Sequence, residues 1–197
     1  LDKMSIESNY VSCILDKCDC AILNNAITGV NYGSLLTAYA AQEVMAELGL
    51  FAKIINHTRV PIENYENSFA KAFADEYLNL TSLCQAEDDY YKLNDKTNVF
   101  FVGSDQVWNM KYYGHQIDKV LLNFVQDDKL KISLAASFGL DEFERTEEQK
   151  KCFSRSLRSF NAISTREDSG VEICKSTFNQ MAEWILDPVF ILNREKY

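Results

Sequence analysis

Short apolar runs alternate along this chain with longer segments of helical spacing, and no other feature constrains the fold as strongly. The strand-like runs lie at residues 20–23, 51–55, 99–102, 132–138, 162–165 and 184–186. Helical spacing marks residues 35–48, 146–160 and 171–178. Strands that alternate with helices are typical of parallel sheets. We therefore expect an α/β fold with a mainly parallel, Rossmann-like sheet flanked by helices.

Residues 62–93 interrupt this alternation. They mix polar and aromatic residues at helical spacing and show no strand pattern. The segment is longer than a simple crossover, so we expect an inserted pair of helices there. The chain has 197 residues, of which 47% are hydrophobic and 25% are charged. This length and composition predict a single α/β domain over residues 1–197.

The charge balance is acidic, because 20 Lys and Arg residues oppose 29 Asp and Glu residues and leave a formal net charge of −9. Nucleic-acid binding depends on cations that neutralise phosphates, so we expect no nucleic-acid partner. The longest uncharged stretch, residues 20–42, contains amides, hydroxyls and glycines. The hydrocarbon core of a bilayer rejects such groups, and we expect no transmembrane segment.

The cysteines and histidines show no spacing typical of metal ligands. Six cysteines in a chain of this length are too sparse for a disulfide scaffold. We expect buried or incidental thiols and a reducing, cytoplasmic location. His57 and His115 are isolated in the sequence, and we expect packed or solvated roles for both.

Polar or glycine-containing turns follow nearly every predicted strand. They lie at residues 31–34, 103–109, 137–139, 166–167 and 187–188. In open parallel sheets, ligands bind beyond the carboxyl ends of the strands, where such turns lead into helices. The sequence therefore predicts that these turns build one cleft at a single edge of the sheet.

The turn at residues 31–34 has two interpretations. Gly33 allows close backbone approach, and free N–H groups at a helix start favour an anion. Alternatively, Asn31 or Ser34 simply caps the helix. Both interpretations place this turn at the start of the helix that follows the first strand.

The turn at residues 103–109 combines a carboxylate, an amide, a hydroxyl and an indole directly after a buried strand. Asp105 could serve as a general acid or base, and Trp108 could offer an apolar face to a sugar ring whose hydroxyls bond Asn109. Alternatively, Asp105 caps a helix and Trp108 packs in the core. Arg166, after a later strand, suits bidentate recognition of carboxylate or phosphate, or it forms a surface ion pair with a neighbouring acid.

Five motifs in the same order resemble those of the polysaccharide pyruvyl transferase family. They are NYGSLL at 31–36, GSDQVWN at 103–109, AASFG at 135–139, ISTREDSG at 163–170 and LDP at 186–188. The resemblance spans residues 20–192, and the GSDQVWN string is its most specific part. It implies the N-terminal lobe of a two-lobed transferase of GT-B type. It also implies transfer of a pyruvyl (carboxyethylidene) group from phosphoenolpyruvate onto two hydroxyls of a sugar, with no further cofactor.

The resemblance also implies roles for particular residues. Arg166 matches the arginine of the family's S-x-R-E segment and would clamp phosphoenolpyruvate, whereas Asp105 matches the aspartate of its GSD segment and would act as acid or base. The other residues expected to bind substrate are Asn31, Tyr32, Gly33, Ser34, Ser104, Gln106, Trp108, Asn109, Ser137, Gly139 and Glu167. The acceptor would be a glycan, or a lipid-linked or nucleotide-linked sugar, of capsule, exopolysaccharide or cell-wall synthesis.

One departure from the family concerns its second lobe, which follows the D-P segment and carries further Arg and His residues for the donor. This chain ends nine residues after Pro188, so we expect it to represent the first lobe only and to show negligible transfer by itself. An exposed inter-lobe face would favour homo-oligomers. Two alternatives stay open at this point: a glycosyltransferase lobe that uses a nucleotide sugar, and a non-catalytic module that binds a glycan or a partner enzyme.

Overall fold

A single parallel sheet organises the part of the chain that the computed structural model describes, residues 17–25, 31–57, 68–114 and 116–197. The strand order is β2-β1-β3-β4-β5-β6, and every neighbouring pair is parallel. The strands are β1 (Cys20–Leu23), β2 (Ala52–Ile54), β3 (Val99–Asp105), β4 (Leu130–Ala136), β5 (Ser164–Thr165) and β6 (Glu183–Trp184). The expected α/β fold with a parallel, Rossmann-like sheet is confirmed.

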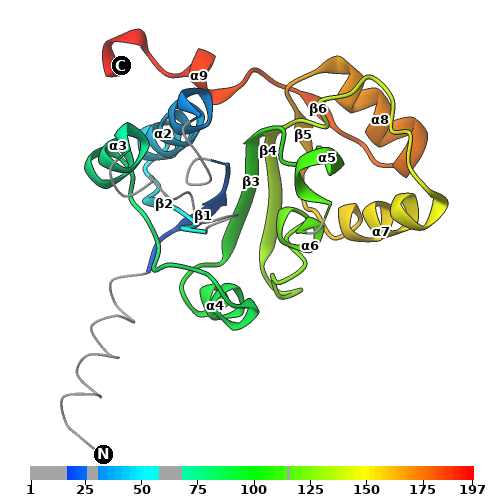
Figure 1. The fold of residues 1–197 in the computed structure, drawn as a ribbon, viewed down its shortest axis with the longest axis horizontal. Coiled ribbons are helices and arrows are strands. Elements are labelled where there is room, and N and C mark those ends of the chain that lie inside the picture. The colour runs from blue at the N-terminus through cyan, green and yellow to red at the C-terminus, as the bar shows by residue number, and fades with distance from the viewer. Residues whose placement is uncertain (1–16, 26–30, 58–67, 115) are drawn as a thin grey trace, which may run out of the picture.

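Helices cover both sides of this sheet (Figure 1). They are α2 (Tyr32–Glu47), α3 (Phe69–Tyr77), α4 (Glu87–Lys92), α5 (Met110–Tyr113), α6 (Ile117–Val120), α7 (Glu147–Leu157), α8 (Asp168–Phe178) and α9 (Pro188–Ile191), with 3-10 turns at Leu93–Asp95 and Arg194–Lys196. In Figure 1, α2 and α3 lie on one side of the sheet, and α5 to α8 lie on the other. None of the helices in the described ranges combines the length and apolar character needed to cross a bilayer.

The central strands bury both of their faces, which explains why they read as uninterrupted apolar runs. In β1, Cys20 and Ile22 pack into the hydrophobic cluster beneath α2. Ala21 and Leu23 face the opposite cluster, which is rich in aromatic rings and lies beneath the helices on the other side. The alternation follows from the two-residue period of a strand. Each face of the sheet therefore has its own core.

The order of the strands creates a switch point between β1 and β3. From β1 the chain passes through α2 to β2, which pairs with one edge of β1. It later returns to β3, which pairs with the other edge of β1. The connections that leave β1 and β3 therefore diverge, which opens a crevice at their carboxyl ends. The sheet order thus directs attention to the segments that follow Leu23 and Asp105.

Several local predictions are confirmed, and others need correction. Thr146 caps α7 in a reciprocal capping box with Gln149, which fixes the start of the helix predicted for residues 146–160. The helical pair predicted for residues 62–93 corresponds to α3 and α4, although residues 62–67 lie outside the described ranges. The short helices α5, α6 and α9 were not predicted, because four residues are too few to show a helical period.

Candidate active site

A cavity of about 590 Å³ lies at the carboxyl edge of the sheet, beside the switch point. Six of the residues singled out in the sequence line it: Asn31, Gly33, Ser34, Asp105, Arg166 and Glu167. They come from the start of α2 and the ends of β3 and β5. The predicted gathering of these strand-end turns into one cleft is therefore confirmed for these residues.

Arg166 is the centre of the charged groups in this cavity. Its Nε lies 2.9 Å from Glu167 Oε1, and its Nη1 lies 3.2 Å from Asp187 Oδ2. The third contact, from Nη2 to Asp105 Oδ1, is longer at 3.6 Å. One guanidinium thus faces three carboxylates, which gives this group a formal charge of −2. The surface ion pair considered for Arg166 is real, but it extends to two acids from distant strands.

The pKa of the Arg166 guanidinium reflects two opposed effects. Partial burial acts to lower it, whereas the hydrogen bond and charge of Glu167, the charge of Asp105 and the hydrogen bond of Asp187 raise it. The carboxylates together outweigh burial, so the pKa lies above the ordinary value for arginine. Arg166 is therefore a permanent cation in this cavity.

Both carboxylate oxygens of Asp105 accept hydrogen bonds. Its Oδ2 accepts hydrogen bonds from Ser34 Oγ at 2.7 Å and Asn25 Nδ2 at 3.3 Å. Its Oδ1 accepts from the backbone N–H of Gln106 at 2.8 Å. Every one of these partners donates, which suits a carboxylate that accepts only. Asp105 also has a φ of 80°, a left-handed conformation that is uncommon for residues other than glycine and is concentrated at functional sites.

Asp187 connects the cavity to the strand beneath it. Its Oδ2 accepts a hydrogen bond from the buried Ser104 Oγ at 2.5 Å as well as from Arg166. Its Oδ1 accepts from the N–H of Val189 and so caps α9. Sequence reasoning placed Ser104 in the substrate site, yet its hydroxyl is buried and supports Asp187 instead. The aspartate before Pro188 was the available signal for Asp187, because it combines a strand end with a proline at the first helical position.

The start of α2 is a capped helix terminus. Asn31 Oδ1 accepts hydrogen bonds from the N–H groups of Gly33 and Ser34, which the anion interpretation had left free. The capping interpretation is therefore confirmed. Tyr32 is exposed, and its ring lies 5.6 Å from that of Phe69 rather than in the cavity.

Trp108 is a core residue, and the sugar-platform interpretation is wrong for it. The indole is fully buried, its Nε1 donates to the carbonyl of Val120 at 3.1 Å, and its ring packs against Phe138. The exposed indole at the cavity is that of Trp184, which donates to the carbonyl of Arg166 at 3.0 Å. Trp184 lies in a short edge strand, and its position in the sequence did not indicate that its side chain lines the cavity.

The remaining predicted residues form a support behind the cavity. Asn109 caps α5 by accepting from the N–H of Lys111, so the helix cap considered for Asp105 belongs to Asn109. Asn109 Nδ2 also donates to Gln106 Oε1. Gly139 has a φ of 65°, and a Cβ there would lie 2.6 Å from both of those side-chain atoms. Ser137 is buried, and its Oγ accepts from the N–H of Gly139.

Comparison with known families agrees with this arrangement. The sequence model of the polysaccharide pyruvyl transferase family matches residues 31–197, which include the start of α2 and the ends of β3, β5 and β6. The chain belongs to the polysaccharide pyruvyl transferase family. No curated protein matches it significantly. The family match covers Ser34, Asp105, Arg166 and Asp187, the groups that the cavity brings together.

The described residues include His, Cys, Asp and Glu side chains, the usual protein ligands of metal ions. No group of three or more His, Cys, Asp and Glu side chains among them is arranged to hold an ion. His57 is buried, and its Nε2 lies 2.9 Å from the carbonyl oxygen of Asn24, which agrees with the packed role expected for it. His115 lies outside the described residues.

Proposed function

We propose that this cavity takes part in transferring the pyruvyl group of phosphoenolpyruvate onto two hydroxyls of a sugar, forming a cyclic ketal on a polysaccharide or cell-wall glycan. The observation that carries the proposal is the contact of Arg166 with Asp105 and Asp187 at the switch point of a chain of this family. An arginine beside a carboxylate supplies an anion-binding group and a base within one cavity.

The reaction requires proton transfer and charge stabilisation. The CH2 carbon of the enol gains a proton, and the central carbon gains positive character. One sugar hydroxyl then bonds to the central carbon, the second displaces phosphate, and the product is a ketal plus inorganic phosphate. Of the two hydroxyl protons, one ends on the new methyl group and the other leaves with phosphate. A positioned base near the hydroxyls is therefore needed.

Asp105 is our candidate for that base. Its neighbours Ser34 and Asn25 donate to Oδ2, so Oδ1 is the oxygen available to a sugar hydroxyl. Oδ1 keeps one short hydrogen bond, from the N–H of Gln106. This arrangement holds the carboxylate in a fixed orientation, which is what proton transfer at a defined atom requires.

Arg166 is our candidate for the group that binds the donor, and its longest contact is the place where the donor would bind. The donor's carboxylate or phosphate would replace the 3.6 Å contact between Nη2 and Asp105 Oδ1. Replacement would leave Oδ1 of Asp105 without its contact to the cation at the moment the donor is bound. Asp187 and Glu167 would keep their shorter contacts and hold the guanidinium plane in place.

The negative charge of this cavity also weakens binding of the anionic donor. Three carboxylates around one guanidinium repel a phosphorylated acid, so Arg166 alone is a weak clamp. Further cations are required, and we propose that they come from the second lobe that the family resemblance implies. For the same reason we expect negligible transfer from the 197-residue chain by itself.

The acceptor would lie against Trp184. This indole lines the cavity and is 63% exposed, which leaves a ring face for the apolar side of a sugar. Its Nε1 is occupied by the carbonyl of Arg166, which fixes the ring relative to the clamp. The sugar hydroxyls would then lie between the indole and Asp105.

Mass spectrometry of glycan acceptors tests the proposal. The protein that contains this chain is incubated with phosphoenolpyruvate and candidate glycans, and a parallel reaction contains a panel of nucleotide sugars instead. We expect an acceptor mass increase equal to one carboxyethylidene group, together with release of one phosphate for each group added. A mass increase equal to a sugar would identify a glycosyltransferase, and no change with any acceptor would identify a binding module.

A further inference from the structure

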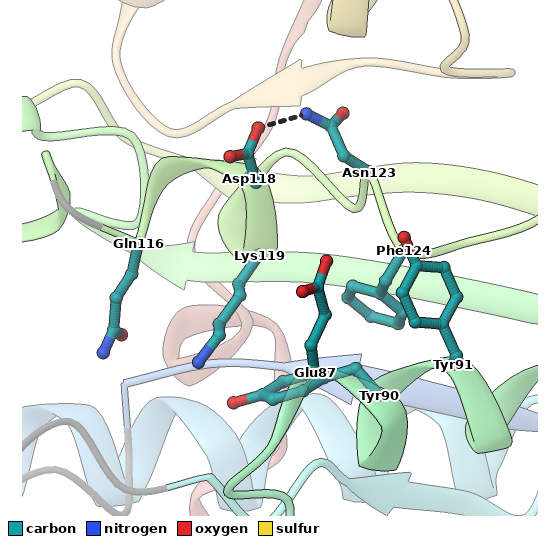
Figure 2. Close-up of a pocket in the computed structure, with 8 residues that line it drawn as sticks. All are labelled: Glu87, Tyr90, Tyr91, Gln116, Asp118, Lys119, Asn123 and Phe124. Atoms are coloured by element: carbon teal, nitrogen blue, oxygen red, sulfur yellow. Dashed lines mark hydrogen bonds between the residues drawn. The ribbon is translucent and has the colours of Figure 1, made fainter.

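A second cavity, of about 390 Å³, lies between α4 and α6 and shares no lining residue with the cavity at Arg166. Tyr90 and Phe124 form its buried base, with ring centroids 5.3 Å apart. Polar side chains surround these rings: Glu87, Gln116, Asp118, Lys119 and Asn123 (Figure 2). Pockets for small molecules begin at about 300 Å³, so this cavity has room for one small ring.

Two polar atoms at this cavity have no hydrogen-bond partner in the part of the chain that the structure describes. They are the hydroxyl of Tyr90 and Oε1 of Gln116. Tyr90 is 1% exposed, and leaving its hydroxyl unsatisfied is costly. Burial, together with the nearby Cys84 and Asp89, raises the pKa of Tyr90, so the hydroxyl stays protonated and can donate. The cavity therefore offers a ligand one buried donor and one buried acceptor.

Figure 2 shows how these groups are directed. The polar ends of Tyr90, Gln116 and Lys119 lie toward one side of the cavity in this view, and Glu87 rises between Lys119 and Phe124. At the top of the view, Asn123 Nδ2 donates to Asp118 Oδ1 at 2.7 Å. Hydrogen-bonding groups thus surround an aromatic base.

The charges around the cavity decide the class of ligand. Lys119 Nζ already lies 4.6 Å from the ring centroid of Tyr90, so the place of a cationic ligand over that ring is taken. Glu87 and Asp118 would repel an anion. The groups that remain suit a neutral ligand rich in hydroxyls. One ligand hydroxyl can accept from Tyr90 and another can donate to Gln116, while an apolar ring face packs on Phe124.

We propose that the cavity between α4 and α6 binds one neutral sugar ring, separately from the pyruvyl-transfer cavity. Its hydroxyls would satisfy Tyr90 and Gln116 and reach Glu87 and Asp118. The inference does not depend on pyruvyl transfer, because the site needs no group from the cavity at Arg166. A sugar residue within a glycan and a free monosaccharide share this chemistry.

Titration of the isotopically labelled full chain, followed by two-dimensional NMR, tests the site. The probes are methyl glycosides of glucose, galactose and mannose, which represent residues in a glycan, and the corresponding free sugars. Choline and inorganic phosphate are the cationic and anionic controls. We expect at least one neutral sugar to shift the signals of Tyr90, Gln116 and Lys119, with weaker or no shifts from either control. Preference for the glycosides or for the free sugars then assigns the source.

Two variants sharpen the test. Tyr90→Phe removes only the hydroxyl, and Gln116→Met removes only the amide. We expect each to weaken sugar binding about threefold to tenfold, the change in affinity that loss of one hydrogen bond produces. Thermal stability of Tyr90→Phe should be unchanged or higher, because a buried group without a partner is removed. The matched control, Tyr77→Phe, changes an exposed tyrosine on α3 and should bind as the parent does.

Three results would overturn the proposal. One is the absence of signal changes at this cavity with every neutral sugar. Another is binding of choline or phosphate as tight as that of the sugars. The third is loss of sugar binding in Tyr77→Phe equal to that in Tyr90→Phe, which would move the site to a separate cavity between α2 and α3 that Tyr77 lines.

Discussion

The hydroxyl of Ser34 lies 2.7 Å from Oδ2 of Asp105, although 71 residues separate the two in the chain. Ser34 belongs to the first turn of α2, and Asp105 is the last residue of β3. The hydrogen bond therefore joins the two connections that diverge at the switch point of the sheet. It fixes the direction of a carboxylate that we propose to be the catalytic base, so its removal has a measurable consequence.

Ser34→Ala should lower kcat about threefold to tenfold, because Asp105 loses one of the donors that orient it. The KM for phosphoenolpyruvate should change little, since the Ser34 hydroxyl donates to Asp105 and not to Arg166. Ser176→Ala, which removes a hydroxyl from the exposed face of α8, is the matched control. Steady-state kinetics of both variants decide the matter. Equal kinetics in the two would mean that the Ser34 hydroxyl has no role in positioning Asp105.

Arg166→Lys keeps the positive charge but loses the planar fork that contacts three carboxylates. We expect a higher KM for phosphoenolpyruvate together with a lower kcat, each by about tenfold, as the loss of a charge-assisted hydrogen bond predicts. Arg158→Lys, at the exposed end of α7, provides the control. If Arg166→Lys lowers kcat and leaves KM unchanged, the guanidinium does not bind the donor.

The two tryptophans should respond in opposite ways. Trp108→Ala should destabilise the fold by about 3–5 kcal/mol, because a fully buried ring is replaced by a cavity. Trp184→Ala should cost far less stability, since its ring is mostly exposed, but it should weaken acceptor binding. Urea unfolding and the KM for the acceptor measure the two effects. A stable Trp108→Ala variant with poor acceptor binding would restore Trp108 to the substrate site.

Two buried cysteines make the free energy of unfolding depend on pH in the alkaline range. Burial first, and nearby charges for Cys20, raise the pKa of the Cys20 and Cys174 thiols from 9.0 to about 12. Above pH 9 the unfolded chain loses these protons while the folded chain keeps them, so the free energy of unfolding falls as pH rises from 9 to 12. Cys20→Ala and Cys174→Ala should each reduce this pH dependence in urea unfolding. An unchanged slope would mean that other groups cause it.

Much of the fold followed from the sequence because both faces of the central strands are buried. The core of β3 reads as an apolar run over residues 99–102, although the strand continues to Asp105 through residues predicted as a turn. Its place in a parallel sheet follows from the helices between strands. The short strands β5 and β6, two residues each, carry no such signal of their length. Their extent depends on pairing with neighbours, which is a property of the folded chain.

The candidate site was predicted in part for a related reason. Asp105 ends β3 and Arg166 follows β5, and the strand-end rule finds both without knowledge of their contacts. The same rule also points to Asn25, which follows β1 and donates to Asp105. Which side chains point into the cavity depends on tertiary packing. Trp108, in the most specific motif, faces the core, whereas Trp184, in an edge strand, faces the cavity.

The kcat of Asp105→Asn tests the central claim most directly. Asparagine keeps the size and polarity of Asp105 but accepts no proton from a sugar hydroxyl. In the protein that contains this chain, with saturating acceptor and with phosphoenolpyruvate varied, phosphate release should fall about a hundredfold or more while the KM for phosphoenolpyruvate changes little. A kcat close to that of the parent would contradict the account and would leave Asp105 as a structural link between α2 and β3.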